Sequence, residues 1–115
     1  SLIGSPSQIM MEGKILFIED LDEMLYHIDR MMVNLKRIGF LSNLAGLVVG
    51  GMSDMKDNSI PFGKSAEEIV FDAVSKFDYP ICFNFPAGHI NDNRALIMGR
   101  EVSLDVGQEL VMLRF

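Results

Sequence analysis

Short apolar runs that alternate with helix-like segments constrain the fold of this chain more than any other feature. Apolar runs occupy residues 14–18, 47–49 and 81–83, as expected for strands that are buried on both faces. Two segments with apolar residues at helical spacing lie between them. This strand–helix–strand–helix–strand order predicts parallel strands joined by right-handed crossovers.

The first helical segment has one continuous apolar stripe. Offsets of three and four residues relate Met24, Leu25, Ile28, Met31, Met32, Leu35 and Ile38. Residues 20–23 have the pattern of a capping box, with Asp20 as the N-cap, and Gly39 is placed to end the helix. The methionine pairs are interpreted as core residues and not as a cofactor site.

The second helical segment begins at another capping box, formed by Ser65 and Glu68. Its apolar positions are Ile69, Val70, Ala73, Val74 and Phe77. The strand before it is predicted to end at Gly50-Gly51, and residues 52–63 read as an exposed loop.

The last third of the chain has no helical pattern. Residues 95–98 and 102–104 flank a Gly99-Arg100 turn and predict a two-residue β-hairpin, and residues 110–113 predict a closing strand. The expected fold is therefore an α/β domain with a mixed sheet, βαβαβ followed by a hairpin and a closing strand, curled toward a barrel.

Composition limits the classes of protein to consider. A chain of 115 residues holds one hydrophobic core, and its net charge of −6 argues against a nucleic-acid surface. No apolar run approaches the length of a membrane span, and no signal peptide is recognised. The single cysteine, Cys82, is expected to be buried. Residues 1–12 read as a linker remnant and residues 13–115 as the domain, with an intracellular location expected.

His89 is the first candidate for chemistry. It lies in a loop punctuated by Pro86 and Gly88, and histidine titrates near neutrality, so it is a candidate proton carrier. Glu19 ends the first strand, and parallel strands bring their carboxyl ends to one edge of the sheet. The sequence leaves open whether His89 is catalytic or a solvated loop residue. For Asp20, helix capping is favoured over catalysis.

Other site types find no support. His27 lies a helix away from His89, is expected to be exposed, and has no metal-ligand spacing. Gly50-Gly51 fits neither phosphate-loop pattern, so no nucleotide site is expected.

Several segments in order resemble one family. They are residues 13–20 (GKILFIED), 26–31 (YHIDRM), 45–50 (AGLVVG), 85–89 (FPAGH) and 96–99 (LIMG). Together they resemble the C-terminal domain of the LD-carboxypeptidases, or muramoyltetrapeptide carboxypeptidases, and their microcin-immunity relatives. The resemblance covers nearly the whole chain.

The resemblance implies a serine peptidase with a Ser–His–Glu triad split between two domains. His89 matches the general base, and Glu19 matches the residue that orients it. The reaction implied is removal of the terminal D-alanine from murein tetrapeptides during cytoplasmic peptidoglycan recycling, without a cofactor or metal. The family's fold is a swivelling β/α barrel-like domain, and its members commonly form homodimers.

One departure concerns the nucleophile, which the family carries on its N-terminal domain. No serine of this chain lies in a nucleophile elbow, so the chain alone is expected to be inactive. The residues after His89 do not distinguish a murein substrate from a microcin-like peptidyl nucleotide. A non-catalytic interaction module, dimerising through apolar helix faces, is the competing hypothesis.

Overall fold

The order of the first five elements confirms the predicted alternation. The computed structural model describes residues 2–115 and contains β1 (Ile15–Leu21), α1 (Leu25–Arg37), β2 (Gly46–Ser53), α2 (Ala66–Val74), β3 (Ile81–Cys82), β4 (Ser103–Val106) and β5 (Val111–Arg114). The first three strands form one parallel sheet in the order β1-β2-β3. The chain is therefore an α/β domain, as predicted.

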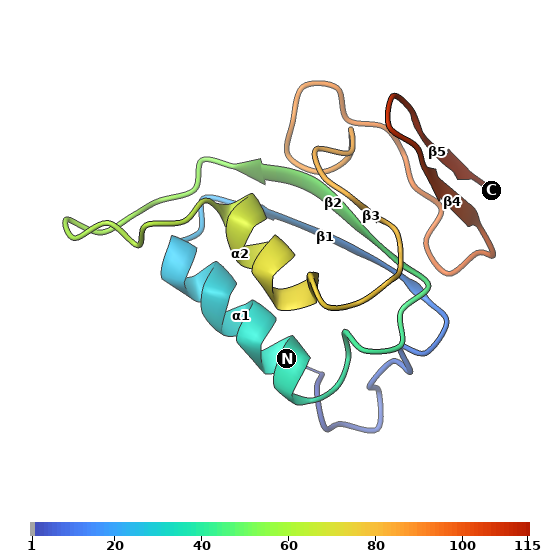
Figure 1. Cartoon of the computed structure of the whole chain (residues 1–115), viewed down its shortest axis with the longest axis horizontal. Helices are drawn as coiled ribbons and strands as arrows, with labels where there is room; N and C mark the ends of the chain where they lie inside the picture. Colours follow the sequence, from blue (N-terminus) through green and yellow to red (C-terminus); the bar gives the residue numbers. More distant parts are fainter. Residues whose placement is uncertain (1) are drawn as a thin grey trace.

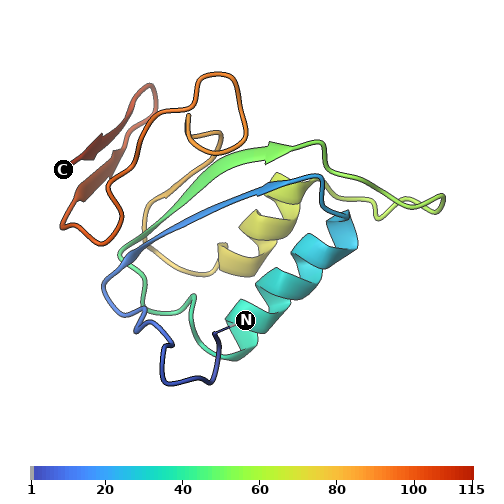
Figure 2. The ribbon, with the colours of Figure 1, turned by 180° about the vertical axis from the view of Figure 1, so that it is seen from behind.

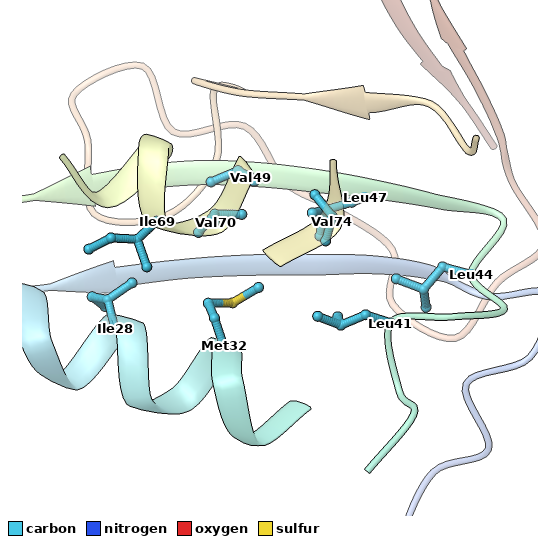
Figure 3. Close-up of a cluster of buried hydrophobic side chains, with 9 residues drawn as sticks. All are labelled: Ile28, Met32, Leu41, Leu44, Leu47, Val49, Ile69, Val70 and Val74. Carbon is cyan, nitrogen blue, oxygen red and sulfur yellow. The ribbon is translucent and has the colours of Figure 1, made fainter. Parts of the chain in front are cut away.

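The parallel sheet has two differently covered faces. Both helices pack on one face, and the segment after β3 and the β4–β5 hairpin lie on the other (Figures 1 and 2). The buried cluster lies between the sheet and the helices (Figure 3), and it consists of Ile28, Met32, Leu41, Leu44, Leu47, Val49, Ile69, Val70 and Val74. Side chains alternate along a strand, so the strand residues next to these core positions point to the opposite face of the sheet, where the hairpin lies.

The start of α1 differs from the prediction. Asp20 does not cap the helix, because β1 continues to Leu21, which pairs with Ser53 of β2. Met24 is the N-cap, and its side chain makes no capping hydrogen bond. Continued strand pairing thus overrides the local capping pattern and delays the helix.

The helices themselves follow their sequence signals closely. Ser65 caps α2 in a complete capping box with Glu68, as predicted. In α1, Ile28 and Met32 are buried, whereas Met31 of the predicted stripe is 44% exposed. Neither helix in residues 2–115 is long and apolar enough to cross a membrane.

β2 is longer than predicted from the position of the Gly50-Gly51 pair. Instead of ending at Gly50-Gly51, the strand continues through both glycines to Ser53. The pairing with β1 shifts here, because Glu19 alone lies opposite the two glycines. Two residues opposite one define a β-bulge, a feature that redirects nearby side chains.

The C-terminal part corrects the predicted hairpin. Residues 95–102 form no strand, and the antiparallel pair is β4 with β5. This pair is a separate two-stranded sheet, so the predicted single mixed sheet is wrong, and the strands of residues 2–115 do not close into a barrel. The apolar residues 96–98 instead line a cleft of about 490 Å³ against Phe17 and Val48, on the face of the parallel sheet opposite the helices.

Candidate active site

The bulge in β2 lies beside Glu19. Ile18, the preceding residue of β1, packs against the core on the helix side. Glu19 therefore points to the opposite face, toward the segment that follows β3. Its side chain is only 25% exposed, so neighbouring groups restrict it.

The loop that carries His89 is fastened along β2. The amide of Phe85 donates to the carbonyl of Val49 at 3.0 Å, and the amide of Gly51 donates to that of Ala87 at 3.0 Å. These two bonds guide the chain after β3 across the bulge and bring His89 over the carboxyl end of the sheet.

Three glycines leave the space that this approach requires. A Cβ atom on Gly50 would lie 2.4 Å from the carbonyl oxygen of Ala87, and one on Gly51 would lie 2.5 Å from a methyl carbon of Ile90. Gly88 has a φ of +108°, and a Cβ there would lie 2.8 Å from Oε2 of Glu19. The sequence predicted Gly50-Gly51 at the end of a strand, but nothing local in it indicated that the pair seats this loop.

His89 and Glu19 meet at this seat, although 70 positions separate them in the sequence. Nδ1 of His89 lies 2.8 Å from Oε2 of Glu19. A carboxylate only accepts hydrogen bonds, so it favours the histidine tautomer with the proton on Nδ1. Nε2 is then left with a free lone pair. The His89 side chain is 58% exposed, so a group outside this domain has access to it.

This arrangement has the chemistry of a carboxylate-oriented base. Nε2 can accept a proton, and Glu19 can stabilise the imidazolium that results. Among residues 2–115, the serine that bonds to this loop is Ser53, and its hydroxyl donates to the main-chain carbonyl of His89, not to the ring. The arrangement thus pairs a histidine with a carboxylate, and no serine among residues 2–115 is hydrogen-bonded to Nε2 of His89.

The remaining predicted residues lie elsewhere. His27 is half-buried, not exposed as expected, and its Nδ1 contacts Glu23, which lies just before the N-cap of α1. The backbone amide of Met24 and the contact with His27 lower the pKa of Glu23. Cys82 is buried, as predicted, and burial raises the pKa of its thiol. Within residues 2–115, no three His, Cys, Asp or Glu side chains gather as a metal site.

Comparison with known proteins decides the family. The profile of the LD-carboxypeptidase C-terminal domain matches residues 1–104. The chain belongs to the LD-carboxypeptidase family. This family membership confirms the resemblance read from the sequence segments.

Relatives of this LD-carboxypeptidase domain agree with the assignment. A probable murein peptide carboxypeptidase of Bacillus subtilis (strain 168) is 30% identical over 113 residues, which are 98% of this chain and 35% of the relative. The crystal structure of muramoyltetrapeptide carboxypeptidase from Oxalobacter formigenes matches with a TM-score of 0.83 and 28% identity, over 97% of this chain and 38% of that one. The chain thus spans little more than a third of the length of these proteins.

A third comparison concerns the fold alone. The microcin C7 self-immunity protein MccF, in complex with aspartyl sulfamoyl adenosine, matches with a TM-score of 0.62 at 19% identity. The match covers 74% of this LD-carboxypeptidase domain and 25% of MccF.

Proposed function

We propose that this domain supplies the general base and its orienting carboxylate to a serine-type LD-carboxypeptidase. His89 is the base and Glu19 is the residue that orients it. The observation that carries the proposal is the 2.8 Å contact between Nδ1 of His89 and Oε2 of Glu19, which leaves Nε2 accessible. The serine and the oxyanion donors belong to an N-terminal domain, consistent with relatives almost three times as long as the matched segment.

In the proposed reaction, Nε2 of His89 takes the proton of the attacking serine hydroxyl as its oxygen bonds to the scissile carbonyl. The imidazolium then gives that proton to the amine of the departing D-alanine. Nε2 of His89 then takes a proton from a water molecule as the water oxygen attacks the acyl-enzyme, and the imidazolium gives that proton to the serine oxygen when its bond to the acyl carbon breaks. Glu19 keeps its charge throughout and stabilises each imidazolium.

The proposed substrate is the tetrapeptide of murein, cleaved in the cytoplasm during peptidoglycan recycling. Its basis is the description of the Bacillus subtilis and Oxalobacter formigenes relatives, which align with almost all of this chain. The likeness to MccF gives a second substrate class to assay, an aminoacyl or peptidyl nucleotide.

The test measures D-alanine release from murein tetrapeptide by the two-domain enzyme that contains this chain. His89→Ala should lower kcat by roughly 10²- to 10⁴-fold, the usual contribution of a general base. His27→Ala is the matched control, because His27 also pairs with a carboxylate but lies on α1. It should leave kcat near the parental value, whereas equal rates for both variants would remove His89 from the mechanism.

Assays of the same enzyme with both substrates distinguish the two substrate classes. D-alanine release with no cleavage of a peptidyl nucleotide supports the murein assignment, and the reverse pattern rejects it. If neither substrate is cleaved by the parent enzyme, the interaction-module hypothesis gains support and the enzymatic proposal fails.

A further inference from the structure

Ser53 ends β2 and joins three parts of the candidate site. It pairs with Leu21 at the end of β1, and its carbonyl accepts a hydrogen bond from the amide of Asp22. Its hydroxyl donates to the carbonyl of His89 at 2.8 Å, across 36 positions of sequence. A short side chain at a rigid strand end thus fixes the main chain of the proposed base.

Apart from the contact with Glu19, the His89 ring depends on this main-chain anchor for its position. The side chain is 58% exposed, so packing does not determine its position. Within the part of the chain that the structure describes, Ser53 is the residue that hydrogen-bonds the His89 carbonyl. The neighbouring loop bonds act before His89, at the carbonyl of Ala87 and at the amide of Gly88, which donates to the side chain of Asn93. After His89, the amide of Ile90 donates to the carbonyl of Gly88.

We propose that Ser53 is a positioning residue that holds the His89 ring on Glu19 through the carbonyl of His89. This inference rests on the proposed function for its catalytic consequence, but its structural consequence stands by itself. A serine has one side-chain torsion, so the β2 strand end fixes where its hydroxyl points. The bulge at Gly50-Gly51 sets that strand end beside the loop.

Three substitutions separate the hydroxyl from the shape of the side chain. Ser53→Thr keeps a hydroxyl, Ser53→Val has nearly the shape of threonine but no hydroxyl, and Ser53→Ala removes the hydroxyl without adding bulk. Ser53→Ala still tests the loss of the hydroxyl if the bulkier valine does not fit at this position.

The first readout uses this 115-residue chain and needs no nucleophile. Long-range ¹H–¹⁵N spectra identify which ring nitrogen of His89 carries the proton. In the parent and in Ser53→Thr, the Nδ1-protonated tautomer should dominate at pH 8. In Ser53→Ala and Ser53→Val, the Nε2-protonated tautomer should appear beside it, with thermal unfolding still cooperative.

The second readout is D-alanine release by the two-domain enzyme. Ser53→Ala and Ser53→Val should lower kcat about tenfold, since displacement of a catalytic group by less than 1 Å already costs rate. KM should stay near the parental value, and Ser53→Thr should restore most of kcat.

The outcomes distinguish the two proposals. If Ser53→Ala and Ser53→Val keep the parental tautomer and kcat while His89→Ala loses activity, Ser53 is not a positioning residue and the proposed function stands. If they change the tautomer while His89→Ala keeps full activity, Ser53 positions His89 but the proposed function fails.

Discussion

Replacement of Gly88 by alanine gives a sharp test of how the site is built. Gly88 has a φ of +108°, a conformation that non-glycine residues adopt only under strain. A new Cβ would also lie 2.8 Å from Oε2 of Glu19 and 3.1 Å from its Cβ and Cγ. Gly88→Ala therefore combines backbone strain with a direct collision at the proposed orienting residue.

Gly63→Ala separates these two effects. Gly63 has a φ of +87°, but a Cβ there would have no neighbour within 4 Å. Backbone strain should cost each variant about 1–3 kcal/mol of unfolding free energy, since residues in sparsely populated backbone regions cost this much. In a domain of this size the strain lowers Tm by roughly 4–12 °C.

The collision acts on Gly88→Ala alone. An ordinary contact with Oε2 needs 3.4 Å, so Oε2 and the new Cβ must separate by about 0.6 Å, a shift that lengthens the 2.8 Å contact with His89 by up to the same amount, to roughly 3.4 Å. That distance lies beyond a normal hydrogen bond. The His89 tautomer should then become mixed, and kcat in the two-domain enzyme should fall by about 10²-fold.

Thermal unfolding, the His89 tautomer and D-alanine release are measured for both variants. Gly63→Ala should lose Tm yet keep the parental tautomer and kcat. If Gly88→Ala and Gly63→Ala behave alike in the tautomer and in kcat, the collision with Glu19 has no effect, and the space at Gly88 is not needed for the His89–Glu19 contact.

Two further predictions concern side chains outside the site. Burial raises the pKa of the Cys82 thiol, so maleimide should label the folded chain slowly at pH 7 and the urea-unfolded chain quickly, whereas fast labelling of the folded chain would contradict its burial. The pKa of Glu23 lies below its usual 4.5 in the folded state, because the next backbone amide and His27 bond to its carboxylate. Its stabilisation is present above about pH 4.5 and lost as pH falls through the lowered pKa. Tm of Glu23→Gln should therefore decline less steeply than the parental Tm between pH 5 and pH 3, and parallel curves would refute this contribution.

Local signals predicted the elements of this fold where neighbouring residues decide the outcome. The capping box at Ser65 predicted the start of α2 because both partners lie within four residues of one another. The same pattern at Asp20 failed, since pairing with β2 extended β1 past it. A distant strand competes with a local cap, and the local sequence does not contain that information.

The residues of the candidate site also fall into those that the sequence predicted and those that it did not. Glu19 and His89 could be found because each follows an apolar strand and matches a family segment. Gly88 was recognised as part of the loop, but its close approach to Glu19 and the bond of Ser53 to His89 were not predicted, since they are contacts across 69 and 36 positions of sequence. The hairpin was misplaced for a related reason: the apolar residues 96–98 line the cleft on the sheet face opposite the helices and pair with no strand.

The proposed role of Glu19 is tested most directly by kcat for D-alanine release by Glu19→Gln in the two-domain enzyme. The amide keeps the size of the carboxylate but removes its charge, and it can donate to Nδ1 and so favour the wrong histidine tautomer. We expect kcat to fall by roughly 10²-fold or more, because His89 would be misoriented and no carboxylate would stabilise its imidazolium form. A parental kcat in Glu19→Gln would contradict the claim that Glu19 prepares His89 for catalysis.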